Sequence, residues 1–121
     1  MKTIAKLLLT ALGLAVVSTA HASFICSGLI SFLGMSRDGS VYLANGFGVW
    51  NICTVAATLD GAPADACKAW YASLLSAQKT GTRTRVYFNN ADGPENGSLC
   101  SSVGNWVVPG ALLYFIDFLP N

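Results

Sequence analysis

The chain has 121 residues, of which 53% are hydrophobic and 11% are charged, with seven Lys and Arg against six Asp and Glu. A chain of this length holds one small domain and no more. The balanced charge excludes the clustered basic excess on which phosphate binding depends, so we expect no nucleic-acid partner.

Residues 1–22 have the three parts of a secretory signal peptide. Two lysines form a basic start, the run LLLTALGLAVV is apolar, and Ala20-His21-Ala22 is a small-x-small cleavage site. The apolar run is shorter than the roughly 20 residues that a membrane span needs, which argues against an uncleaved anchor. We therefore expect a cleaved signal peptide, a single mature domain over residues 23–121, and a secreted or periplasmic protein without a membrane span.

The mature chain begins with segments that read as strands joined by tight turns. An apolar stretch over residues 25–33 predicts the first strand. A turn over residues 36–40 with a central Asp-Gly pair leads into a second strand that starts at residues 41–43. Asn45-Gly46 marks the next turn, and residues 49–55 predict the third strand.

A helical period follows over residues 66–79. Apolar and aromatic side chains recur at spacings of three and four from Cys67 through Leu74, which places them on one face. Asp65 is a candidate N-cap, and Gly81 occupies the position that helix C-termini prefer. The sequence thus predicts a helix directly after the third strand.

After the helix the period changes to two, which predicts a fourth strand over residues 82–88. Residues 89–102 are polar and rich in Gly, Asn and Pro, so we expect a loop there. Residues 106–118, with a turn at Pro109-Gly110, predict one or two further strands. The alternation in the fourth strand places Thr82, Thr84, Val86 and Phe88 on one face and Arg83, Arg85 and Tyr87 on the other.

All four cysteines lie in the mature part, which together with export predicts two disulfides. Four cysteines permit three pairings. We favour Cys53 with Cys67, because this bridge closes a 15-residue loop and ties the helix to the preceding strand, at a nominal gain of ~3 kcal/mol. Cys26 then pairs with Cys100. A zinc site is the alternative, but no cysteine pair has the close spacing usual for zinc and the mature part has no histidine, so we expect no metal and no cofactor.

The order of the elements indicates the fold class. Three hairpin-connected strands, a helix and further strands predict a mainly β protein with one helix. This is the order of an OB-fold, a five- to six-stranded, partly closed barrel with the helix between strands 3 and 4. The first and fourth strands are neighbours in that barrel, which would bring Cys26 close to the loop that carries Cys100. A small α+β sheet with one packed helix is the alternative.

Several short motifs resemble one bacterial family. They are Ser27-Gly28-Leu29-Ile30, the cysteines on either side of the loop before the helix, the helix with Trp70 and Leu74, and Thr80-Gly81-x-x-x-Arg85-Val86-Tyr87-Phe88. Over about residues 26–88 the chain is similar to the pentameric B subunits of toxins of the subtilase cytotoxin and typhoid toxin type. The resemblance implies an OB-fold, a cell-surface glycan ligand that is sialylated in that family, a homo-pentamer, and a catalytic A subunit as partner.

The resemblance also implies roles for single residues. A serine in the first strand of the family hydrogen-bonds the carboxylate or glycerol part of a terminal sialic acid, and the matching position is Ser27. A phenol at the end of the fourth strand also contributes in the family, and the matching position is Phe88, which has no hydroxyl. The acidic residue that precedes the serine in the family has no counterpart in the mature chain.

The residue types favour binding over catalysis. The mature chain has no histidine, so Ser-His-Asp and Cys-His nucleophile systems are absent, and its acids lie mostly in predicted turns. We therefore expect no enzymatic activity. Aromatic rings can stack on sugar faces, and we expect Trp106 and Tyr87 at the surface. Trp50, Trp70 and Phe115 are expected in the core.

Two functions from different classes are compatible with the sequence. The first is a secreted, lectin-like glycan-binding module that resembles a toxin B subunit. The second is a periplasmic or secreted protein-interaction domain of the same fold with no sugar site. The candidate glycan contacts are Ser27, Arg85, Tyr87 and Trp106.

Overall fold

The computed structural model describes residues 22–120. The predicted signal peptide lies outside the described residues, except for its last residue. No helix in the described part is long and apolar enough to cross a membrane. In chain order the elements are β1 (Phe24–Gly28), β2 (Phe32–Met35), β3 (Ser40–Ala44), β4 (Trp50–Thr54), α1 (Ala64–Thr80), β5 (Thr84–Phe88), α2 (Gly97–Ser102) and β6 (Leu113–Phe118).

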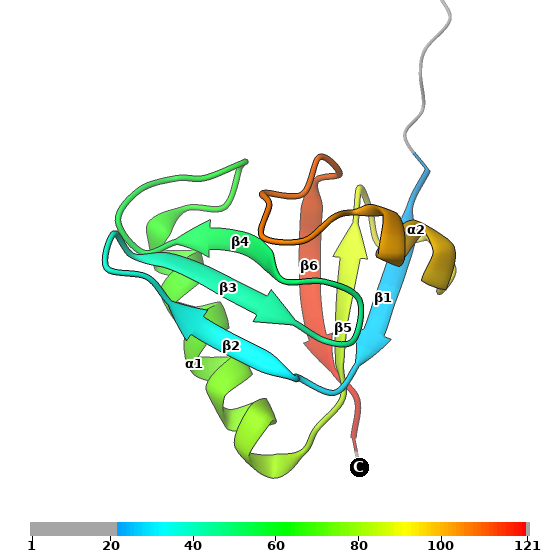
Figure 1. The fold of residues 1–121 in the computed structure, drawn as a ribbon, viewed down its shortest axis with the longest axis horizontal. Coiled ribbons are helices and arrows are strands. Elements are labelled where there is room, and N and C mark those ends of the chain that lie inside the picture. The colour runs from blue at the N-terminus through cyan, green and yellow to red at the C-terminus, as the bar shows by residue number, and fades with distance from the viewer. Residues whose placement is uncertain (1–21, 121) are drawn as a thin grey trace, which may run out of the picture.

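The six strands form two antiparallel sheets of three strands each, in the orders β1-β5-β6 and β2-β3-β4. The two sheets cross steeply in Figure 1, where α1 runs behind the β2-β3-β4 sheet and α2 lies beside β1. The expected mainly β fold is confirmed. The sheets do not join into a closed barrel in the described part, where only an isolated bridge from Trp50 to Val107 links β4 to the segment before β6.

The predicted first strand is divided into β1 and β2, because the chain leaves the first sheet after Gly28 and bends at Ser31 before β2 begins. A side chain at Gly28 would place its Cβ 1.8 Å from the backbone oxygen of Asn45, so only glycine allows the close approach. The buried side chain of Asn45 donates a hydrogen bond to the carbonyl of Cys26 at 3.0 Å. The bend directs the chain from one sheet into the other.

Helix α1 is longer at both ends than the predicted range of residues 66–79. Pro63, in an extended conformation, occupies the N-cap position and makes no side-chain cap, so the prediction of Asp65 as N-cap is wrong. Asp65 instead lies in the first turn, where its charge suits the positive end of the helix. Gly81 has a φ of 66° and donates its N–H to the carbonyl of Ala77, which confirms the predicted C-terminal glycine.

The segment over residues 89–102 is not all loop, because it ends in the short helix α2. The side chain of Asn96 accepts a hydrogen bond from the N–H of Leu99 at 3.0 Å and thereby caps this helix. The prediction of a single helix was therefore wrong. Six residues are too few to show a helical period in the sequence.

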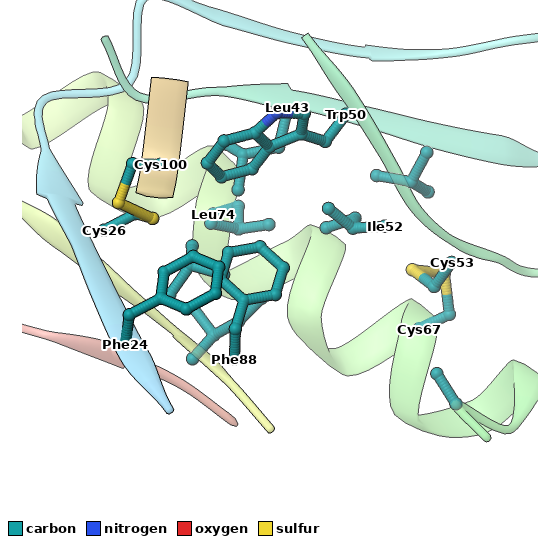
Figure 2. Packing of buried hydrophobic residues seen from close by; sticks show 14 residues of the cluster. Phe24, Cys26, Leu43, Trp50, Ile52, Cys53, Cys67, Leu74, Phe88 and Cys100 are labelled. Carbon is teal, nitrogen blue, oxygen red and sulfur yellow. A yellow bond between two sulfur atoms is a disulfide. The ribbon is translucent and has the colours of Figure 1, made fainter. Parts of the chain in front are cut away.

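The core lies between the two sheets and α1, and aromatic rings form its centre (Figure 2). Phe88 is fully buried, stacks on Phe24 with ring centroids 4.8 Å apart, and meets the edge of Trp50 at 5.4 Å. The disulfides lie on either side of these rings in Figure 2. Both predicted pairings are confirmed, and the bridges are Cys26–Cys100 and Cys53–Cys67.

Candidate ligand-binding faces

The face of the β1-β5-β6 sheet that points away from the core brings three predicted contacts together. Ser27 and Arg85 are directly opposite each other on β1 and β5, and Arg85 is opposite Asp117 on β6. The guanidinium of Arg85 holds Asp117 with two hydrogen bonds, from Nε at 2.8 Å and from Nη2 at 2.6 Å. This hydrogen bonding raises the pKa of Arg85. The charge of the arginine is thus already matched within the sheet.

Tyr87 belongs to the same network. Its hydroxyl donates a hydrogen bond to Asp117 at 3.1 Å, and its ring meets the edge of Phe115 at 5.5 Å. The side chain is only 8% exposed. Burial, and then the hydrogen bond to Asp117, raise the pKa of the phenol. The expected surface position of Tyr87 is therefore wrong, because Phe115 covers it and is itself 49% exposed rather than in the core.

Ser27 shows the limit of this face as a binding site. Its hydroxyl oxygen is buried and has no hydrogen-bond partner among the described residues. A ligand could bond to it only after neighbouring groups had moved. Asp117 was not among the predicted site residues. It is the single acid in the last apolar stretch, and such an isolated acid is a signal of a charged partner on a neighbouring strand.

Trp106 lies in the segment between α2 and β6 and packs against the β2-β3-β4 sheet, apart from these three residues. Its ring is 58% exposed, which confirms the expected surface position. It contacts Phe32 on β2 and Tyr42 on β3, with centroid distances of 5.5 and 5.4 Å. These rings border a hollow of about 190 Å³. We call it the aromatic hollow, and it is lined by Phe32, Gly34, Met35, Ser36, Tyr42 and Trp106.

The backbone of Trp106 is in the left-handed region that a bulky residue rarely adopts, with a φ of 57°. Hydrogen bonds with β4 and with Val49, which precedes β4, hold the backbone in this conformation. Trp106 donates its N–H to the carbonyl of Val49 at 2.6 Å, and the N–H of Asn51 donates to the carbonyl of Val107 at 2.9 Å. The indole N–H of Trp50 donates to the carbonyl of Gly104 at 3.1 Å. Strain of this kind persists where the surroundings impose it and is common at functional sites.

No protein-family model, no curated protein and no solved structure matches the chain. The likeness to toxin B subunits therefore rests on the motifs alone. Two of their positions can be placed in the fold. The serine position, Ser27, has a buried hydroxyl, and the phenol position, Phe88, lies in the core.

Two other depressions are larger than the aromatic hollow. One, of about 300 Å³, lies at the C-terminal half of α1 and has Phe118 as its aromatic residue. The other, of about 270 Å³, lies at the start of α1 and includes Trp70 and Tyr114. Trp70 is half-buried and packs against the core, as expected. Neither depression contains an exposed ring that contacts two other rings, as Trp106 does.

The acidic side chains form no metal-binding group in the described part. No group of three or more His, Cys, Asp or Glu residues is close enough there to hold a metal ion. Asp117 accepts hydrogen bonds from Arg85 and Tyr87, and Asp38 accepts them within its own turn, from Ser36 and Ser40. Hydrogen bonding from Ser36 lowers the pKa of Asp38. These two carboxylates stabilise local structure.

Proposed function

We propose that the protein is an exported glycan-binding module whose ligand stacks on Trp106. The observation that carries this proposal is the exposed indole of Trp106, which contacts two further rings on a residue whose backbone is left-handed. Contacts with two rings restrict the side chain before a ligand binds, so binding costs less conformational entropy. Stacking of a sugar face on it is therefore more favourable than on a mobile side chain.

Export is part of the proposal. The two disulfides are typical of proteins from oxidising compartments, and the leader has the features of a signal peptide. The full chain should therefore be expressed in a bacterial host and purified from its periplasm. N-terminal sequencing should find Ser23 first. A product that retains the leader would contradict cleavage after Ala22.

The finer description of the fold is also a proposal. The element order supports an OB-fold in which β1 and β2 are two halves of one strand, bent between Gly28 and Phe32. Exposed apolar side chains at and before β6 support association of several copies, which the family resemblance extends to a homo-pentamer with a catalytic A subunit. Light scattering of the exported protein measures the number of copies. The exposed side chains are Leu112, Tyr114 and Phe115.

A glycan array tests the function itself. The exported protein should bind a defined set of terminal sugars, and Trp106→Ala should abolish that binding. Leu29→Ala is the control, because Leu29 is similarly exposed, at 53%, but is not part of the lining of the aromatic hollow. Absence of binding to any glycan by the wild-type protein would refute the proposal.

The second candidate function is a protein-interaction domain on the same fold. It is favoured by the number of large apolar side chains at the surface, which include Val107 and Val108 beside Trp106. A partner protein captured from the periplasm, with an affinity that Trp106→Ala reduces, would support this function if the glycan array shows no binding.

A further inference from the structure

We infer that the aromatic hollow takes the apolar face of a single uncharged pyranose ring, and that sialic acid is not the ligand. This inference rests on the proposed function and names its ligand class. It differs from the expectation that follows from the toxin B subunits, both in the sugar and in the sheet that binds it.

The size of the hollow limits the ligand. Its volume of about 190 Å³ is below the roughly 300–1,000 Å³ of sites for drug-sized molecules. A volume of this size accommodates one small ring. Longer glycans would thus place a single residue in the hollow and extend over the rim.

The chemistry of the lining suits a pyranose. Three of the six lining residues are aromatic, and none of the six carries a charge. One face of a pyranose ring presents C–H groups, while its hydroxyls lie around the edge. The faces of Trp106 and Tyr42 can pack against the C–H groups, and their indole N–H and phenol O–H can hydrogen-bond the hydroxyls.

Gly34 keeps the hollow open. It lies opposite Tyr42 in the pairing of β2 with β3 and is itself part of the lining. A Cβ added here would lie 3.3 Å from the ring of Phe32, tighter than an ordinary contact. A larger side chain would therefore occupy the space of the ligand.

A sialic acid carboxylate finds no charged partner in the lining of the hollow. None of the six lining residues is charged, and the hydroxyl of Ser36 already donates to Asp38, whose negative charge repels a second carboxylate. Arg37 in the same turn is exposed and is not part of the lining. On the other sheet, Arg85 is neutralised by Asp117. Phe88 is in the core and the hydroxyl of Ser27 is buried, so neither can contact a sugar there.

The test uses the exported protein and two probes, methyl β-D-galactopyranoside and the methyl α-glycoside of N-acetylneuraminic acid. Saturation-transfer NMR titrations should show binding of the neutral glycoside only. Trp106→Ala and Gly34→Val should each weaken it at least about tenfold, as expected for the loss of a stacking platform. Ser27→Ala is the matched control and should bind as the wild-type protein does. Thermal unfolding of each variant establishes that it is folded.

The outcomes separate this inference from the proposed function. Binding of the sialoside that Ser27→Ala abolishes and Trp106→Ala leaves intact would overturn the inference while glycan binding itself stands. Binding of the neutral glycoside with the same affinity in Trp106→Ala would also overturn it. Failure of both probes and of every array glycan would overturn the proposed function as well, and Trp106-dependent binding of a protein would then identify the hollow as a protein contact.

Discussion

Replacement of Phe88 by tyrosine introduces a hydroxyl into the core, and we expect it to destabilise the protein. Phe88 is 0% exposed, and its ring lies between Phe24 and Trp50 in the core. A hydroxyl buried without a hydrogen bond costs about 1–3 kcal/mol. Overpacking of a filled core adds a similar amount. The expected decrease in the free energy of unfolding is therefore about 2–6 kcal/mol.

Urea unfolding of the oxidised protein measures this change. For a small domain the expected loss corresponds to a midpoint lower by roughly 1–3 M. Phe115→Tyr adds the same hydroxyl to a ring that is 49% exposed, and should change stability by no more than about 0.5 kcal/mol. If Phe88→Tyr were as stable as Phe115→Tyr and gained affinity for a sialoside, Phe88 would lie at a sugar site and the account of the core would be wrong.

Two further predictions concern stability. The raised pKa of Tyr87 means that the folded protein favours the neutral phenol. The contribution of this phenol to the free energy of unfolding is therefore complete below the ordinary pKa of about 10, and it is lost as the pH rises through the folded-state pKa. Melting temperatures should therefore fall less steeply above about pH 10 in Tyr87→Phe than in the wild-type protein, and equal slopes would contradict this. Removal of the Cys26–Cys100 bridge by double alanine substitution should lower the free energy of unfolding by about 4.5 kcal/mol, against about 3 kcal/mol for Cys53–Cys67. The difference arises because the sequence separations are 74 and 14, so the first bridge closes the longer loop. Urea midpoints in the reverse order would contradict this reasoning.

The sequence was sufficient for those features that depend on local spacing. The apolar period through Cys67 and Leu74 located α1, and Gly81 marked its end. Alternation along β5 placed Val86 and Phe88 inward and Arg85 outward. The short loop between Cys53 and Cys67 indicated one disulfide and left the other two cysteines as the second, and both pairings are confirmed.

Features that depend on contacts between distant segments could not be predicted in the same way. The backbone of Asn45 passes so close to Gly28 that no other residue fits there, which no local pattern reports. Tyr87 is buried because Phe115, on the neighbouring strand, covers it. The composition around Trp106 indicated exposure, but not that Phe32 and Tyr42 flank the ring.

The candidate site was predicted only in part for the same reason. Ser27, Arg85 and Tyr87 do lie together, but Asp117 from a strand near the end of the chain occupies the polar groups of Arg85 and Tyr87. Trp106 packs against the other sheet, and the hollow beside it includes Gly34, which no chemical motif distinguished. A site made by packing becomes visible only when the segments are brought together.

The most direct test of the central claim, that a sugar stacks on Trp106, is an NMR titration of the three indole N–H resonances of the exported protein. Trp106→Phe assigns one of them by its absence. We predict that addition of methyl β-D-galactopyranoside shifts the Trp106 resonance and leaves those of Trp50, which is fully buried, and Trp70 in place. An unchanged Trp106 resonance under a glycan that binds, with shifts at Ser27 or Arg85 instead, would contradict the account.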